Sequence, residues 1–218
     1  MRRHSLSEPI RRALRQQAAA LHVSLPARVE QYDHAEQRAN VLPLIKREYA
    51  DGLIESIPVV NDVPVIWPRS GGAQMTMPVK RGDTVLLVFA DRSIDNWLAQ
   101  GGEIEPDDRR QHDISDAVAI PGLVSFADWG SDPEPSENND DVLLRYAGSK
   151  VRLKPGGNVE VETATTVVVN TAQVTINSPV QVNGDVNVSG DVVAGGVSLT
   201  SHTHAGVVAG DDDTQEPN

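Results

Sequence analysis

The sequence contains no cysteine, few aromatic residues and no long apolar run. Without cysteine, disulfides and thiolate metal sites are excluded, so a metal ion would need His, Asp or Glu as ligands. Aromatic residues make up only 4% of the 218 residues, although they normally dominate the burial energy of a core. We therefore expect part of the chain to be extended or to bury its surface against other chains.

Membrane insertion and export signals are also missing. No stretch of 18 or more apolar residues is present, which argues against a transmembrane helix. The N-terminus carries arginines but lacks the apolar segment of a secretory signal peptide. We expect neither feature in this protein.

The net charge of −12 is unevenly distributed. Residues 1–22 contain five arginines and a single acid, whereas residues 155–218 contain eight acids and no lysine or arginine. A segment with that charge repels phosphate backbones. We therefore expect no nucleic-acid partner.

The N-terminal segment, residues 1–25, is predicted to be a helical arm with its helix over residues 7–22. Ile10, Leu14 and Leu21 recur at helical spacing and form one apolar stripe, and the arginines lie off it. Two interpretations stay open. The helix packs on its own domain, or it is an arm that docks on a neighbouring subunit.

Residues 26–127 are predicted to form a small barrel with an OB-type Greek key. Short strand-like runs alternate with Pro and Gly, and the predicted strands include residues 38–49, 53–60, 63–67 and 83–90. The apolar run at 84–89 is typical of a strand buried on both faces. The barrel lacks interleaved aromatic and basic residues, which favours a structural role over nucleic-acid binding.

A polar linker follows at residues 128–142. It contains six acids, no bases and two prolines between residues 128 and 141. Such a composition does not form a packed core. We interpret it as a domain boundary.

After a transitional stretch, residues 158–199 carry alternating apolar residues, which we call the valine ladder, within a predicted β-helix over residues 143–200. The pairs are Val159/Val161, Val167/Val169, Val174/Ile176, Val180/Val182 and Val186/Val188. Near the end they tighten to a hexad with Gly184 and Gly190 at the corners, which is typical of a β-solenoid. A single-chain left-handed β-helix would have little more than two coils here, too few for a continuous core. Three intertwined chains are the favoured alternative.

His202 and His204 follow the ladder, at the start of a tip and acidic tail over residues 201–218. In an extended chain, residues two apart point to the same side. Two imidazoles alone make a poor metal site, but three copies on a threefold axis supply six nitrogens. The alternative to a metal site is that both histidines are solvated tail residues.

These residues together resemble the central spike proteins at the tail tip of contractile-tailed bacteriophages and related bacteriocins. The barrel blocks Gly82–Trp97 and His112–Ala117 look like the OB domain of such spikes, and the ladder looks like their triple-stranded β-helix. The stretch Ser201–Gly206 matches the His-x-His motif at their tip. The likeness covers residues 26–206.

The resemblance implies a mainly β homotrimer whose tip binds one iron ion through His202 and His204 of three chains. It also allows calcium and chloride within the β-helix, with no residues assigned to them. The implied partners are baseplate hub and tail tube proteins, with transient contact to the host outer membrane. The implied location is the tail tip of the virion, where the spike pierces the envelope when the sheath contracts.

An enzyme is not expected, and no catalytic or cofactor-binding residue is predicted. No nucleophile elbow, phosphate-binding loop or His-Glu-x-x-His motif occurs. Two other functions stay open. One is a hexapeptide-repeat acyltransferase with His202 or His204 as base; the other is a trimeric receptor-binding fibre, although no aromatic residue follows Tyr146.

Overall fold

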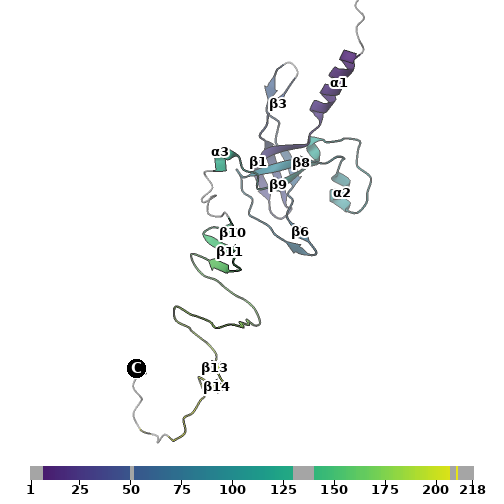
Figure 1. Ribbon diagram of the computed structural model, residues 1–218. Coiled ribbons are helices and arrows are strands. Elements are labelled where there is room, and N and C mark those ends of the chain that lie inside the picture. Colours follow the sequence, from purple (N-terminus) through teal and green to yellow (C-terminus); the bar gives the residue numbers. More distant parts are fainter. Residues whose placement is uncertain (1–6, 50–51, 130–139, 207–209, 211–218) are drawn as a thin grey trace, which may run out of the picture. The chain divides into compact units, whose positions relative to one another are not determined.

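A computed structural model describes residues 7–49, 52–129, 140–206 and 210 (Figure 1). The chain divides into two compact units, Met1–Val142 and Leu143–Asn218, which are described separately. It is mainly β with a short N-terminal helix, as predicted. None of the described helices is long and apolar enough to cross a membrane.

The N-terminal helix, α1, spans Ser7–Ala20 and ends two residues before the predicted boundary. After the helix, the amide of His22 donates to the carbonyl of His112 at 3.2 Å, two residues before the first barrel strand begins. Ile10 and Leu14 on the apolar stripe remain 57% and 59% exposed. The stripe is therefore uncovered by the described part of its own chain.

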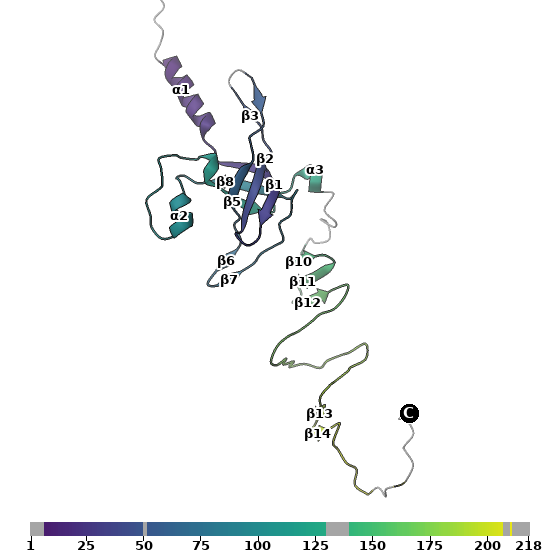
Figure 2. The ribbon, with the colours of Figure 1, turned by 180° about the vertical axis from the view of Figure 1, so that it is seen from behind.

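The barrel is a five-stranded antiparallel sheet in the order β5-β2-β1-β8-β9. Its strands are β1 (Ser24–Asp33), β2 (Arg38–Pro43), β5 (Val60–Pro64), β8 (Thr84–Phe89) and β9 (Ala117–Pro121). A parallel bridge between Val65 and Ala119 joins the two edges of the sheet. The amide of Ile66 also donates to the carbonyl of Ala119 at 2.9 Å. The curled sheet is thereby closed in the OB manner, and Figure 2 shows it from behind.

Alternate residues of the strands fill the barrel, as the period of two requires. The interior consists of alanines and valines with one leucine and two aromatics: Ala27, Val29, Ala39, Val41, Val63, Val65, Trp67, Val85, Leu87, Phe89, Ala117 and Ala119. Burying each large apolar side chain contributes roughly 1.5–3 kcal/mol. The other face of β8, including Leu86 and Val88, is only half-buried. The expectation that this strand is buried on both faces is wrong.

Three of the predicted strands differ in extent, and the one predicted at 63–67 is β5, which spans Val60–Pro64. The predicted strand 38–49 splits, because β2 ends at Pro43 and the chain continues into a hairpin of β3 (Arg47–Glu48) and β4 (Ile54–Glu55). Most of the predicted strand 53–60 is therefore irregular. Proline has no amide to donate, so it ends a strand that pairs on both sides. The small hairpin β6 (Arg69–Ser70) and β7 (Ala73–Gln74) follows β5.

A loop between β8 and β9 carries two short helical segments and a buried ion pair. It contains α2 (Asp95–Gln100) and a 3₁₀ turn at Ile114–Asp116. The Asp116 carboxylate is fully buried and accepts from Arg110 Nε at 2.6 Å and Nη2 at 3.0 Å. It also accepts from the amide of Ile94 at 3.0 Å. These bonds hold the loop against the barrel.

The predicted linker lies largely outside the described residues, since 130–139 are not described. At its edges, the short helix α3 spans Phe126–Trp129 and β10 begins at Val142.

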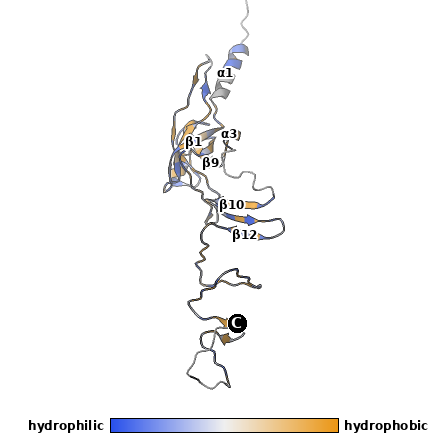
Figure 3. Ribbon diagram, turned by 90° about the vertical axis from the view of Figure 1, so that its left-hand side faces the viewer, coloured by the Kyte–Doolittle hydropathy of each residue, from blue (hydrophilic) through white to orange (hydrophobic). Residues whose placement is uncertain are grey.

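The second unit begins with a three-stranded meander. Its strands are β10 (Val142–Tyr146), β11 (Ser149–Leu153) and β12 (Val159–Glu162). Val151 pairs with Val161 and Leu153 with Val159, so apolar residues share one face. Lys150 and Arg152 pair with Glu162 and Glu160 on the other face. The hydropathy colouring in Figure 3 marks β10 as hydrophobic and most of α1 as hydrophilic or neutral.

The valine ladder beyond β12 forms no strand within the chain between residues 163 and 192. No backbone–backbone hydrogen bond joins these described residues to one another. Only the hairpin β13 (Val193–Ala194) and β14 (Val197–Ser198) closes the segment. Its turn uses Gly195 and Gly196 at φ +59° and +85°, a left-handed conformation that favours glycine.

Candidate metal centre

The two predicted metal ligands lie next to each other. The imidazoles of His202 and His204 have ring centroids 5.1 Å apart, with the ring planes at 79°. Both side chains are exposed. One chain thus presents a pair of adjacent imidazoles at its surface.

The local backbone determines which nitrogen of His202 is available. Its Nδ1 lies 3.0 Å from the carbonyl oxygen of Ser198 and 3.2 Å from that of Leu199. A carbonyl can only accept, so Nδ1 carries the proton and donates. Nε2 then keeps its lone pair, which is available to a metal ion because the side chain is exposed. A backbone carbonyl often orients metal-binding histidines in this way.

A short turn supports the pair. The amide of Thr200 donates to Asp191 Oδ1 at 3.1 Å, and the amide of Ser201 donates to Ser198 Oγ at 3.0 Å. Hydrogen bonds from Ser198 and Thr200 lower the pKa of Asp191, so its carboxylate is ionised at neutral pH. The sequence analysis did not predict these hydrogen bonds and assigned no role to Asp191.

A single chain does not complete a metal site. Across the described residues, no three His, Asp or Glu side chains gather in a way that could hold a metal ion. The donor type still fits one, since neutral imidazole nitrogens bind iron, zinc, copper and nickel. The iron site, with calcium and chloride in the ladder, stays a prediction.

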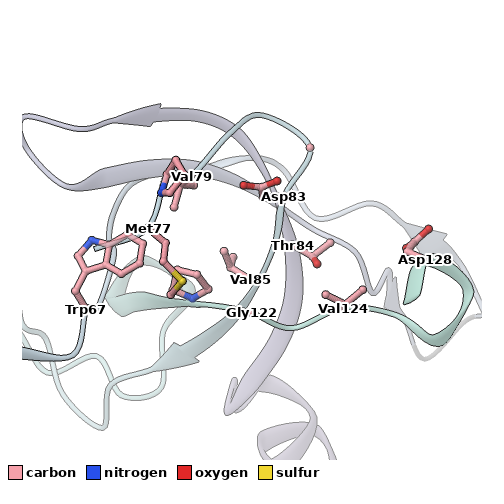
Figure 4. A pocket seen from close by; sticks show the side chains of 12 residues that line it. Trp67, Met77, Val79, Asp83, Thr84, Val85, Gly122, Val124 and Asp128 are labelled. Atoms are coloured by element: carbon pink, nitrogen blue, oxygen red, sulfur yellow. The ribbon is translucent and has the colours of Figure 1, made fainter. Parts of the chain in front are cut away.

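The barrel also carries a hollow beside Trp67 (Figure 4). It has a volume of about 560 Å³ and is walled mainly by apolar side chains around Trp67, Met77 and Val85. Its polar side chains include Asp83, whose carboxylate accepts from the amide of Lys80 at 2.8 Å. The described residues that line the hollow include no histidine, lysine or arginine. This set offers no nucleophile with an adjacent base.

Two family profiles match the chain. Residues 25–122 match the phage protein Gp138 N-terminal domain, a region that includes almost all of β1 and runs through β9. Residues 196–218 match the GpV Apex motif, which includes His202 and His204. A search among curated proteins finds no match.

Proposed function

We propose that this chain, a phage tail spike-type structural protein by its two matches, is the homotrimeric central spike of a contractile tail. It is a component of the virion and associates with other tail proteins. The finer assignment is that the trimer occupies the tip of the baseplate and pierces the host envelope when the sheath contracts.

The observation that carries this proposal is the uncovered valine ladder. No described side chain between residues 143 and 206 is buried. Val167, Val174 and Val186, for example, are 59%, 61% and 68% exposed. The faces between them are polar, with Gln181 and Asn183 hydrogen-bonded at 3.2 Å along the chain. An extended segment with one apolar face and one polar face needs other chains to cover the apolar one.

The meander at the start of the ladder supports the same conclusion. Leu153 and Val161 on its apolar face are 48% and 60% exposed. On the opposite face, Lys154 Nζ lies 2.6 Å from Glu160 Oε1. A sheet with one charged face and one bare apolar face is stable when the apolar face packs on another layer.

A trimer would satisfy both the apolar faces of the valine ladder and the histidine pair that follows it. Three apolar faces enclose a core around one axis, and the unpaired strand edges of each chain then find partners in the next. On the same axis, three copies bring six imidazole nitrogens together at His202 and His204. The single-chain acyltransferase coil is less well supported, because residues 163–192 do not stack into coils within the chain.

The metal would act as a structural clasp. His202 and His204 of three chains would hold it, and an ion so bound would tie three chain termini together. Six donors would leave no position open for substrate or water, so catalysis is not part of the proposal. Within the chain, the carbonyls of Ser198 and Leu199 orient His202 for this task.

The mechanical role follows from the intertwined core. A strand cannot leave such a core without disturbing every layer that it contacts. The intertwined β-helix therefore resists bending and unfolding under load. The three barrels of the trimer would attach the intertwined β-helix to the baseplate hub and the tail tube.

Deleting residues 143–218 tests the piercing role. We expect a soluble barrel, because the five-stranded sheet has its own core, and we expect particles that assemble but do not infect. Plaque counts of complemented particles give the readout. Normal infectivity with the truncated chain would contradict the proposal.

Metal analysis tests the tip. We expect one iron ion for every three chains after anaerobic purification, and loss of that ion in the His202→Ala variant. The His34→Ala variant, altered in an exposed turn, should keep the metal and serves as the control. A trimer without stoichiometric metal would rule out the clasp but would leave the ladder proposal standing.

A further inference from the structure

We propose that helix α1 of one copy packs on the α2 segment, residues 91–113, of a neighbouring copy. The apolar stripe would lie over Trp97 and Leu98, and the arginines would lie beside the acids of that segment. The inference rests on the proposed trimer, since only an assembly brings a second barrel within reach.

The helix needs a partner for physical reasons. At 14 residues, α1 is close to the length at which isolated helices are marginal in water. Its stripe is exposed at Ile10 and Leu14, and Leu21 just beyond the helix is 46% exposed. Most of the stability of such a helix comes from packing its amphipathic face.

The α2 segment offers a complementary surface. Trp97 and Leu98 are 54% and 39% exposed on a helix that the loop holds in place. Arg110 ties this helix to the barrel by binding both Asp95 and the buried Asp116. The side-chain amide of Asn96 adds a bond to the carbonyl of Glu105 at 3.2 Å. An exposed tryptophan on a rigid support is a typical anchor of a binding surface.

The charges of the two surfaces are opposite. Residues 1–22 carry five arginines and one acid, and residues 91–113 carry seven acids and three arginines. Glu103, Glu105 and Asp107 are exposed and form no ion pair within the described residues. Complementary charge of this kind selects the partner and its register.

The geometry favours a neighbour over the same chain. Only Leu21–Val23 connect α1 to β1, and His22 and Val23 in this connector are hydrogen-bonded to the α2 segment and to β8 of the same chain. The amide of His22 bonds to His112, and the amide of Phe89 donates to the carbonyl of Val23 at 3.1 Å. In its own chain the helix leaves the stripe and Trp97 uncovered. A head-to-tail contact repeated around a threefold axis closes into a ring.

Single cysteines can test this directly, because the chain has none of its own. Two full-length variants, Ala13→Cys and Leu98→Cys, are co-expressed with different tags and treated with a short bismaleimide. We expect a cross-linked product of two chains that carries both tags. Since each chain has one thiol, that product can form only between chains. Each variant alone should cross-link little.

Other products would overturn the inference. A dominant product joining two Ala13→Cys chains would mean that the helices bundle with one another. No cross-link in a sample that light scattering shows to be trimeric would mean that α1 packs elsewhere. A monomer by light scattering would instead refute the trimer, so the two failures are distinguishable.

Charge reversal gives an independent readout. Glu103→Lys with Glu105→Lys should reduce the mixed cross-link several-fold, and Arg11→Glu with Arg15→Glu added to the same chains should restore it. A matched reversal at Glu55, on the β3–β4 hairpin, should leave the yield unchanged. An unchanged yield after the double acid reversal would contradict the proposed contact.

Discussion

An aspartate in place of Val182 should leave the protein monomeric. Val182 is 54% exposed in one chain, and in the proposed trimer its side chain faces the shared core. The substitution places three carboxylates around one axis. Each buried, unpaired charge costs several kcal/mol, and like charges on the axis add repulsion. We expect this cost to exceed the free energy that burial of the neighbouring valines contributes to trimer assembly.

Light scattering measures the outcome. The parent chain should have about three times the mass of one 23.5 kDa chain, and the variant should have the mass of a single chain. Gln181→Asp is the matched control, because Gln181 bonds to Asn183 on the polar face. It should remain trimeric. A trimeric Val182→Asp variant would show that the apolar face does not lie in a shared core.

Replacing Arg110 by alanine should destabilise the barrel by about 3–5 kcal/mol, the usual cost of leaving a buried charge unpaired. Asp116 is fully buried and would retain only the bond from the Ile94 amide. The carboxylates of Asp116 and Asp95 raise the pKa of Arg110, so the guanidinium is always charged in the folded protein. The network also fixes α2, on which the further inference depends.

Urea unfolding followed through Trp67 measures this effect, in a background where Trp97 and Trp129 are phenylalanine. Trp67 is 4% exposed and therefore reports on the barrel interior. Arg92→Ala is the control, since its nearest carboxylate oxygen, on Asp91, is 3.7 Å away and both side chains are exposed. That variant should change stability by about 0–1 kcal/mol. Equal effects of the two substitutions would contradict the role of the buried pair.

The barrel could be predicted only in part. The run at β8 was found because five consecutive apolar residues, Val85–Phe89, follow Thr84 there. Strand β1, which lies at the centre of the sheet, was not singled out. It contains Pro26 and charged residues such as Arg28, features that count against a central strand. The pairing of β1 with β2 begins only at Ala27. The missing amide of Pro26 therefore breaks no hydrogen bond between these two strands.

The sequence predicted the two candidate metal ligands but not the hydrogen bonds of the turn around them. His202 and His204 stand out because they are two residues apart after a periodic segment. The carbonyls of Ser198 and Leu199 orient His202, and Asp191 accepts from the Thr200 amide in the same turn. Serine, leucine and aspartate are too common in turns for their presence alone to indicate a supporting role.

By itself, the sequence determined the ladder, the paired histidines and the unequal charge of the two ends, because these are local or compositional properties of the chain. Only the tertiary structure decided which polar groups are buried. Asp116 became an interior residue and Trp97 an exposed one because burial depends on strands far apart in sequence. The closing bridge between Val65 and Ala119 has the same origin.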